Sequence, residues 1–387
     1  MKILAFIVFF TIALSILFGI NYYIFIHGLK AFGTNPTSRW IYTVGFIFLA
    51  SAYILGRILE RVTNGVISRS LDWLGSYWLG AMVYFLLIVI AIDLFRVINH
   101  YLPLIPLQMR RNPAALNFYL GIASLIVVAG VLMAGRWNAT HPLVRPLEVN
   151  IARRVAGVDS MKIAFVSDIH LGSIVGQRQL RQMVEIINAM RPDVILFGGD
   201  LLDEDLTPVI HRNIGQCLEE LKAPLGAYAI PGNHECYGGI VNATAYLESH
   251  SIRVLRDSVV KLANGVYIVG REDRDGKRIT GQTRRSLADL MQTVDPAAPI
   301  VVLDHQPVNL PETVAAGVDL QLSGHTHHGQ LWPFNYMTAK VYQISRGYRQ
   351  IGKTHFFVSS GYGTWGPPVR LASRSEIIGI VLHFKAE

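Results

Sequence analysis

The chain contains little cysteine and little charge. Its two cysteines, Cys217 and Cys236, form no CxxC pair and are too few for a disulfide framework, so we expect two free thiols. Charged residues make up 16% of the 387 residues and hydrophobic residues 51%, which is apolar for a soluble protein. The length and the composition together predict two regions, one of which lies in a membrane.

The chain also lacks any dense run of basic residues, although its formal net charge is +8. Lysines and arginines are scattered along the sequence, whereas proteins that bind nucleic acid gather them in one segment or on one face. We therefore expect no nucleic-acid partner. The positive excess is instead typical of charges that flank membrane helices and of a site that receives an anionic phosphate.

Long apolar stretches are present, and all of them precede residue 136. A helix needs about 20 apolar residues to cross a bilayer. The first stretch is longer than the apolar segment of a signal peptide and no small-residue cleavage pattern follows it, so we expect a retained helix. Residues 1–135 are predicted to form a transmembrane region with four helices, at about residues 3–26, 40–55, 78–95 and 116–134.

The third apolar stretch contains a carboxylate, Asp93. An acid inside a membrane span is costly and indicates a functional site by default. Because Arg96 follows within one helical turn, an ion pair near the helix end is the alternative interpretation. Between the second and third stretches, residues 57–77 mix apolar and charged side chains, a pattern that fits an interfacial helix and an ordinary loop equally well.

The basic residues in the loops predict how the region is oriented, since cytoplasmic loops carry an excess of lysine and arginine. With the N-terminus inside, the cytoplasmic side carries Lys2, Arg57, Arg61, Arg69, Arg136, Arg145, Arg153 and Arg154, against Lys30, Arg39, Arg96, Arg110 and Arg111 outside. This bias favours an inside N-terminus, and four spans return the chain to the same side. We predict a multi-pass integral membrane protein whose C-terminal domain lies on the cytoplasmic face.

The second region follows a linker and a first strand at residues 136–160 and occupies residues 161–387. Short strand-like runs alternate there with helical patterns, which predicts a layered α/β domain. Polar side chains come just after the buried strands, at Asp168, Asp200, Asn233, His305 and His325. Ligand sites in layered α/β sheets gather at such strand ends, so we expect these side chains to converge on one cleft.

Five short motifs in order carry the chemistry: Asp168-Ile-His170, Gly198-Gly-Asp200, Gly232-Asn-His-Glu235, Asp304-His305 and Gly324-His-Thr-His327. They supply imidazole nitrogens, carboxylate oxygens and one amide oxygen. This mixture suits Zn, Mn or Fe rather than Ca, which prefers oxygen ligands alone. The absence of thiolates argues against a structural zinc site, and the glycines fit sharp turns that bring the backbone close to a ligand.

The five motifs resemble those of the calcineurin-like metallophosphoesterase superfamily, over residues from about 145 to the C-terminus. The segment from Gly361 to Arg370 is similar to that of the membrane-associated branch typified by YkuE and YaeI. The resemblance implies an αββα sandwich and a phosphoric-ester or phosphoanhydride hydrolase with two divalent metal ions. The usual Gly-Gly-His-Thr-His-Gly-Gly reads Ser323-Gly-His-Thr-His-His328-Gly here, a departure that removes no ligand.

The resemblance also implies a role for each motif residue. One metal is assigned to Asp168, His170, Asp200 and His327, and the other to Asp200, Asn233, His305 and His325. Asp200 bridges the two ions in this assignment. His234 acts as a general acid or stabilises the transition state and is not a ligand. Glu235 and Asp304 either orient ligand histidines or serve as local caps, while His328 and Arg370 receive no role.

The substrate class is left open between two alternatives. Residues 331–349 are rich in aromatic side chains, with basic residues interleaved. An apolar, basic rim suits contact with anionic lipids, whereas the same aromatics suit a hydrophobic core. We therefore expect a phosphorylated substrate, either in a lipid head group or soluble, such as a nucleotide. A non-catalytic membrane scaffold on the same fold is the alternative of a different class, and the complete motif set argues against it.

Overall fold

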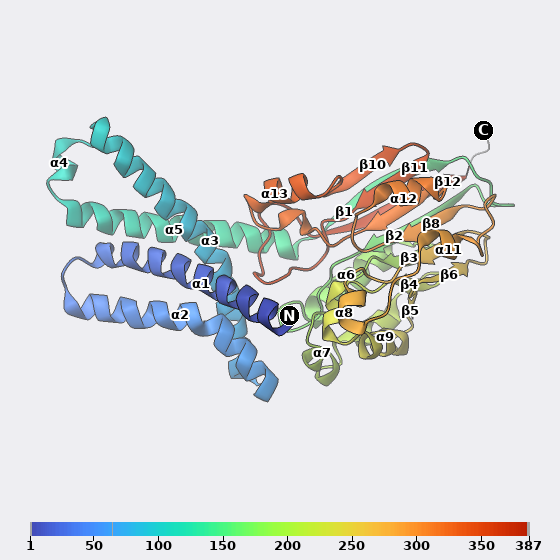
Figure 1. Ribbon diagram of the computed structural model, residues 1–387, viewed down its shortest axis with the longest axis horizontal. Coiled ribbons are helices and arrows are strands. Elements are labelled where there is room, and N and C mark those ends of the chain that lie inside the picture. The colour runs from blue at the N-terminus through green and yellow to red at the C-terminus, as the bar shows by residue number, and fades with distance from the viewer. Residues whose placement is uncertain (1, 64, 385–387) are drawn as a thin grey trace. The chain divides into compact units, whose positions relative to one another are not determined.

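A computed structural model describes residues 2–63 and 65–384. The chain divides into two compact units (Figure 1). One comprises residues 1–135 with 366–368, and the other comprises residues 136–365 with 369–387. The first unit is helical and the second mixes strands with helices, as predicted.

The helical unit is built from four long helices and two short ones. The long helices are α1 (Lys2–Leu29), α2 (Pro36–Thr63), α3 (Val66–Tyr101) and α5 (Pro113–Thr140), and the short ones are η1 (Lys30–Phe32) and α4 (Leu107–Arg110). The four long helices contain segments long and apolar enough to cross a membrane by length and composition. The four predicted apolar helices are thus confirmed, and each extends beyond its apolar run at both ends.

Most of the ambiguous segment 57–77 is helical, because α2 continues to Thr63 and α3 begins at Val66. Glycines let α2 and α3 approach closely. A Cβ added at Gly75 would lie 2.1 Å from the backbone nitrogen of Tyr53, and one at Gly56 would lie 2.5 Å from that of Asp72. Small residues are the usual means of packing helices where lipid supplies no hydrophobic drive between them.

The second unit contains two six-stranded sheets. The first sheet has the order β1 (Leu143–Ile151), β12 (Glu376–Phe384), β2 (Ser160–Val166), β3 (Val194–Phe197), β4 (Ala227–Ala229) and β5 (Arg253–Val254). The second has the order β10 (Gly347–Ile351), β11 (Thr354–Val358), β9 (Leu320–Ser323), β8 (Ile300–Leu303), β7 (Tyr267–Gly270) and β6 (Ser258–Lys261).

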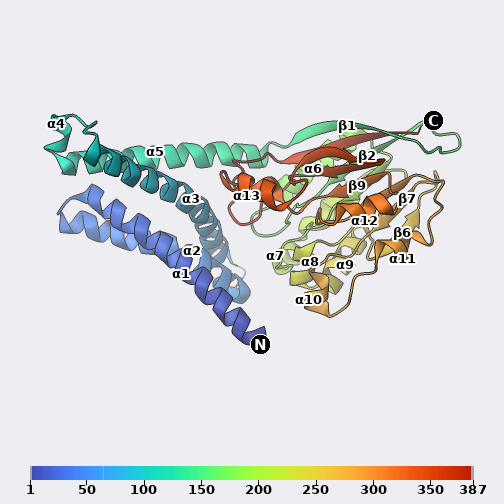
Figure 2. The same cartoon turned by 45° about the horizontal axis from the view of Figure 1, so that its top comes forward.

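Alternation along the strands places one core between the sheets and others beneath the helices. Ile163 and Phe165 of β2 pack against the second sheet, whereas Ala164 and Val166 pack against helices of the first sheet's outer face. These helices are α6 (Gln177–Met190), α7 (Thr207–His211), η2 (Ile214–Glu220) and α9 (Ile240–Ser249). On the second sheet, α11 (Leu287–Met291) and α12 (Leu310–Ala315) cover the outer face (Figure 2). The predicted αββα sandwich is confirmed.

The strand directions explain why the polar residues gather. Strands β2, β3 and β4 run parallel to one another, and so do β7, β8 and β9. Their carboxyl ends therefore open at one edge of each sheet, where the motif loops follow. Short helices continue from these loops, namely α8 (Asn233–Gly238), α10 (Gly276–Thr280), η3 (His327–Gly329) and α13 (Phe334–Val341).

Candidate metal centre

Five of the predicted site residues have a left-handed backbone. Asp168, His170, Asp200, His325 and His327 have φ between 44° and 71°. This region is uncommon for residues other than glycine and persists only where the surrounding structure enforces it. Such conformations cluster at functional sites.

Glycines beside these residues let the chain pass close to the site side chains. A Cβ added at Gly232 would lie 2.1 Å from Asp200 Oδ1, and one at Gly324 would lie 2.3 Å from Asp168 Oδ2. At Gly199, where φ is +90°, a Cβ would lie 2.6 Å from His305 Nδ1. Any side chain at these positions displaces a site residue, so the predicted close approach of the backbone is confirmed.

A first group of potential ligands consists of Asp168, His170 and His327, whose ligand atoms lie within 4.8 Å of one another. The Nε2 atoms of His170 and His327 are 3.0 Å apart. His327 Nε2 is also 3.5 Å from Asp168 Oδ1. Three residues from two distant parts of the sequence thus aim their donor atoms at one point.

A second group consists of Asp200, His305 and His325, again within 4.8 Å. Asn233 belongs with it, because its Oδ1 lies 2.9 Å from His325 Nδ1 and 3.3 Å from His305 Nε2. The amide oxygen therefore faces the same space as the two imidazoles. All seven residues that the motifs suggested as ligands are brought together in these two groups.

Asp200 connects the two groups through a single oxygen. Its Oδ2 lies 3.1 Å from His305 Nε2 and 3.9 Å from His170 Nε2. Its other oxygen, Oδ1, accepts a hydrogen bond of 2.9 Å from the backbone N–H of His234. That bond fixes the carboxylate, so that Oδ2 faces both groups at once.

The donor set fits divalent transition metals. Asp168 and Asp200 are both buried, and Asp168 Oδ2 has no hydrogen-bond partner among the described residues. A buried carboxylate oxygen without a partner is costly unless a cation accompanies it. Burial lowers the pKa of His170 to about 3 and that of His325 to about 4, which leaves neutral imidazoles with a lone pair to offer.

The comparison with known proteins decides the family. The family model for calcineurin-like phosphoesterases matches residues 161–329. The chain is 32% identical to an uncharacterized metallophosphoesterase of Aquifex aeolicus over 228 residues, which cover 58% of this chain and 86% of that protein. The chain belongs to the calcineurin-like phosphoesterase family.

Two further relatives indicate the branch of the family to which the chain is similar. A transmembrane protein with metallophosphoesterase domain from Bos taurus is 32% identical, over 68% of this chain and 61% of that protein. The uncharacterized metallophosphoesterase YkuE of Bacillus subtilis is 32% identical, over 57% of this chain and 78% of that protein. The resemblance drawn from the motifs, including that to YkuE, is confirmed.

The phosphoesterase centre holds His305 through the backbone rather than through Asp304. His305 Nδ1 donates to the carbonyl of Gly198 at 2.7 Å, which leaves Nε2 as the atom that faces Asp200. Asp304 instead accepts hydrogen bonds from Arg284, with Nη1 at 2.9 Å. Of the two roles left open for Asp304, orientation of a ligand histidine is not the observed one, because its carboxylate anchors an arginine.

Glu235 braces the loops that carry Asp200 and Asn233. Its Oε2 accepts from the backbone N–H groups of Asp200 at 3.0 Å and Gly232 at 2.8 Å, while Oε1 accepts from Leu202 at 2.8 Å. Of the two roles left open for Glu235, the local cap is the observed one. The same carboxylate also accepts hydrogen bonds from the neighbouring loop that carries Asp200. Glu235 ties two site loops into one unit.

Glu235→Ala is expected to destabilise the phosphoesterase unit. The change leaves three buried N–H donors without their acceptor, and each unsatisfied donor costs about 1–3 kcal/mol. Thermal unfolding of the detergent-purified chain should show a clearly lower Tm. Glu248→Ala, at an exposed position on α9, is the matched control and should leave Tm unchanged. An unaltered Tm in Glu235→Ala contradicts the bracing role.

His234 has a partner that the motifs did not indicate. Its Nδ1 lies 3.1 Å from Asp203 Oδ1. Burial by itself lowers the pKa of His234, but the hydrogen bond with Asp203 and the charges of Asp200 and Glu204 raise it to about 9. Asp203 lies three residues beyond Asp200 in the same loop. This proximity to a predicted ligand is the signal in the sequence that could have indicated Asp203 as a site residue.

The two residues without a predicted role lie beside the first group. Arg370 is fully buried and donates to the carbonyls of Ser360 at 2.6 Å and Gly363 at 2.8 Å. Its Nη2 is 3.2 Å from His327 Nδ1, so Arg370 supports the site from the interior. His328 faces away toward Ser345, with Nδ1 3.1 Å from the Ser345 hydroxyl.

Proposed function

We propose that this chain is a membrane-anchored, two-metal phosphoesterase that hydrolyses a phosphoester or pyrophosphate bond in a lipid head group. The observation that carries the hydrolytic part is the position of Asp200 Oδ2 between the two groups of ligand atoms. One carboxylate oxygen shared by two such groups is the arrangement that a pair of adjacent cations requires. Membrane attachment rests on the four apolar helices.

The proposed ligands follow the two groups of residues. Asp168, His170, Asp200 and His327 hold one ion, and Asp200, Asn233, His305 and His325 hold the other. When bound, two divalent ions such as Mn, Zn or Fe activate water and neutralise charge on a phosphoryl group. The residues of the chain would hold the two ions side by side, because Asp200 belongs to both groups.

His234 is the proposed proton donor to the leaving oxygen. Its ring lies next to the first group, with its centroid 4.5 Å from that of His170. Asp203 holds Nδ1, so that Nε2 is the nitrogen left to face a substrate. A histidine positioned by a carboxylate on one nitrogen and free on the other is suited to general acid catalysis.

An exposed apolar surface beside the centre supports a lipid substrate. Helix α13 has no buried residue, and Met337 is 65% and Val341 75% exposed. Tyr342, at the end of α13, has its ring 6.0 Å from that of His325. The core alternative for these side chains is therefore wrong for α13 itself. Exposed apolar clusters on a protein surface mark contacts with partners or membranes.

Trp365 extends this surface to the catalytic histidine. It is 59% exposed, and its ring centroid lies 6.4 Å from that of His234. Gln330 joins the two parts, since it donates to the Trp365 carbonyl and accepts from the Trp365 N–H, both at 2.9 Å. Exposed basic residues interleave with the aromatics, at Lys340, Arg346, Arg349 and Lys353. Together they suit the interface of a membrane that contains anionic lipid.

The double variant Met337→Asp/Val341→Asp tests the lipid part of the proposal. Each added carboxylate opposes an anionic surface by about 1 kcal/mol. We expect turnover of a phospholipid or lipid pyrophosphate in anionic vesicles to fall more than tenfold relative to turnover of bis(p-nitrophenyl) phosphate in solution. Val241→Asp, at a valine on α9 that is 71% exposed, is the matched control and should leave this ratio unchanged.

Two results contradict the lipid proposal. One is that the ratio of lipid turnover to bis(p-nitrophenyl) phosphate turnover is the same in the double variant and in Val241→Asp. The other is efficient turnover of soluble phosphodiesters or nucleotides together with no turnover of any phospholipid or lipid pyrophosphate, which favours a soluble substrate. Placement of the domain on the cytoplasmic face, and the absence of a nucleic-acid partner, stay predictions from the loop charges and the composition.

A further inference from the structure

A cluster of partly buried polar side chains joins α1, α3 and α5 of the helical unit, with Asp93 of α3 at its centre. Asp93 Oδ2 accepts from the Tyr23 hydroxyl at 2.6 Å and lies 2.8 Å from His27 Nε2. Its Oδ1 accepts from Arg96 Nη1 at 3.0 Å. Arg96 also donates to Asn117 Oδ1 at 2.9 Å, which ties α5 to the cluster. The Asp93 carboxylate is thus paired, and it contacts two basic side chains, His27 and Arg96.

The cluster holds two basic side chains against one carboxylate. His27 Nδ1 lies 2.9 Å from the carbonyl oxygen of Tyr23, and Nε2 faces the Asp93 carboxylate. His27 and Arg96 therefore share the single carboxylate of Asp93.

The same end of the helical unit is basic as a whole. Residues 27–39 and 93–113 include the turns that join α1 to α2 and α3 to α5 (Figure 1). Five lysines and arginines lie in these two segments, against Asp93 as their one acid. A charge inside or beside a bilayer needs a counter-charge. The basic residues at this end of the helical unit therefore need an anion as counter-charge.

A cavity of about 390 Å³ adjoins the cluster. Apolar side chains of α1, α2, α3 and α5 form most of its wall, and His27, Arg96 and Asn117 line its polar part. Its volume falls in the range of small-molecule sites, which are mostly apolar with a few placed polar groups. The shape and chemistry suit a ligand with one apolar chain and one anionic head.

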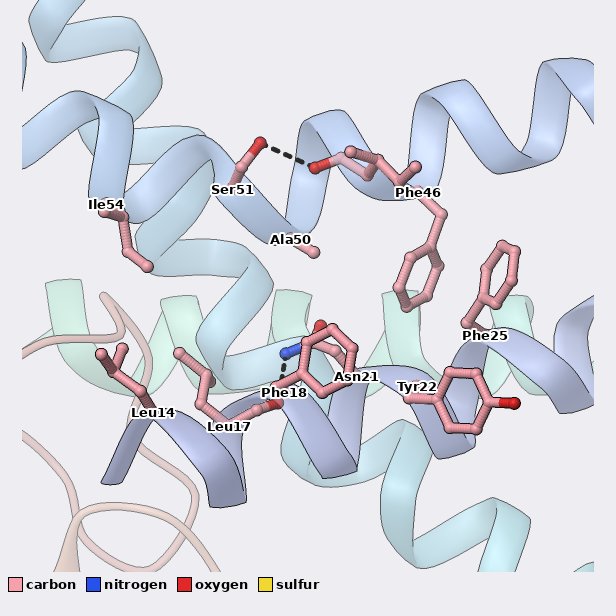
Figure 3. Close-up of a pocket in the computed structure, with 11 residues that line it drawn as sticks. Leu14, Leu17, Phe18, Asn21, Tyr22, Phe25, Phe46, Ala50, Ser51 and Ile54 are labelled. Carbon is pink, nitrogen blue, oxygen red and sulfur yellow. Dashed lines mark hydrogen bonds between the residues drawn. The ribbon is translucent and has the colours of Figure 1, made fainter. Parts of the chain in front are cut away.

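A second cavity in the same unit lacks such polar groups. It lies between α1 and α2, with a volume of about 530 Å³ (Figure 3). Its polar side chains are uncharged. Asn21 donates to Leu17 O at 2.8 Å and Ser51 donates to Ile47 O at 2.7 Å, as Figure 3 shows, and Asn21 Oδ1 accepts from Trp78 Nε1 of α3 at 3.0 Å. This groove can accept lipid chains without selecting among head groups.

We infer that the cavity beside His27, Arg96 and Asn117 binds one anionic phospholipid, separately from the phosphoesterase centre. An acyl chain occupies the apolar part, and the phosphate lies against the His27 and Arg96 side chains. A lipid is favoured over a free anion because most of the wall is apolar and because the surrounding helices are long and apolar enough to lie in a bilayer. This site does not depend on whether the proposed hydrolysis takes place.

Native mass spectrometry of the detergent-purified full chain tests the inference, with phosphatidylglycerol and phosphatidylcholine as probes. We expect one phosphatidylglycerol per chain to bind at least tenfold more tightly than phosphatidylcholine. Gly45→Leu should reduce phosphatidylglycerol binding at least tenfold, because Gly45 lines the cavity and a Cβ there meets nothing within 4 Å, so leucine fills the space. Gly130→Leu is the matched control, since its Cβ also meets nothing within 4 Å and Gly130 does not line the cavity.

Arg96→Gln separates head-group recognition from filling of the cavity. It keeps the Tyr23 and His27 contacts of Asp93 but removes the permanent cation, so the preference for phosphatidylglycerol should fall about tenfold while chain binding persists. Equal phosphatidylglycerol binding in Gly45→Leu and Gly130→Leu overturns the inference, because the lipid then lies elsewhere on the helices. An equal affinity of the unaltered chain for both lipids overturns it as well.

Discussion

Asp200→Asn is expected to remove both bound metal and turnover, with kcat/KM lower by at least about 10³-fold, equivalent to roughly 4 kcal/mol of transition-state stabilisation. The reason is that one oxygen, Oδ2, lies 3.1 Å from His305 Nε2 and 3.9 Å from His170 Nε2, so it serves both groups of ligands. Asparagine removes the negative charge. Its amide also places a donor at one of two positions, either facing the ligand groups or facing the N–H of His234.

The measurement is metal content by atomic emission together with turnover of bis(p-nitrophenyl) phosphate. We expect about two ions per chain before the change and fewer than one after it. Asp289→Asn, at an exposed position on α11, changes the same functional group and should affect neither quantity. Full metal content with undiminished turnover in Asp200→Asn refutes the assignment of the centre.

The sheets and the ligand residues could be predicted because each depends on a local pattern. Strands β3 (Val194–Phe197) and β8 (Ile300–Leu303) are short apolar runs bounded by turn residues, which is the pattern of a buried strand. Each run ends just before a metal-binding type of side chain. Since parallel strands end at one edge of a sheet, sequence order alone indicates that these side chains meet.

The residues that support the centre could not be predicted in the same way. Arg370 reaches His327 across 43 positions of sequence, and only the folded chain places its guanidinium against the carbonyls of Ser360 and Gly363. Strand β12 likewise inserts between β1 and β2, a pairing set by distant segments rather than by local pattern. Gly56 and Gly75 let α2 and α3 approach closely, a contact that a count of apolar residues does not register.

His234→Ala is expected to keep both metals and to lower kcat by about 10²–10⁴-fold, the usual contribution of a positioned acid or base. The metals are expected to stay because the seven proposed ligands are other side chains. His234 also lies in a third group of possible ligands, with His170 and Asp203, but there its Nδ1 is held by Asp203. Asp203→Asn should produce a smaller loss in the same direction, because the imidazole remains while its orientation and charge are no longer supported. His211→Ala, at an exposed histidine on α7, is the control for loss of an imidazole as such.

The leaving group distinguishes the two roles considered for His234. A p-nitrophenolate leaves without protonation, whereas an alkoxide of a lipid or sugar needs a proton as the bond breaks. If His234 is a general acid, the alanine variant loses far more activity with an alkyl ester than with a p-nitrophenyl ester of the same phosphate. Equal losses with both esters mean that the imidazolium stabilises charge on the phosphoryl oxygens instead. Two results exclude both the general-acid role and the charge-stabilising role of His234. One is loss of bound metal in His234→Ala, and the other is an unchanged kcat with both esters.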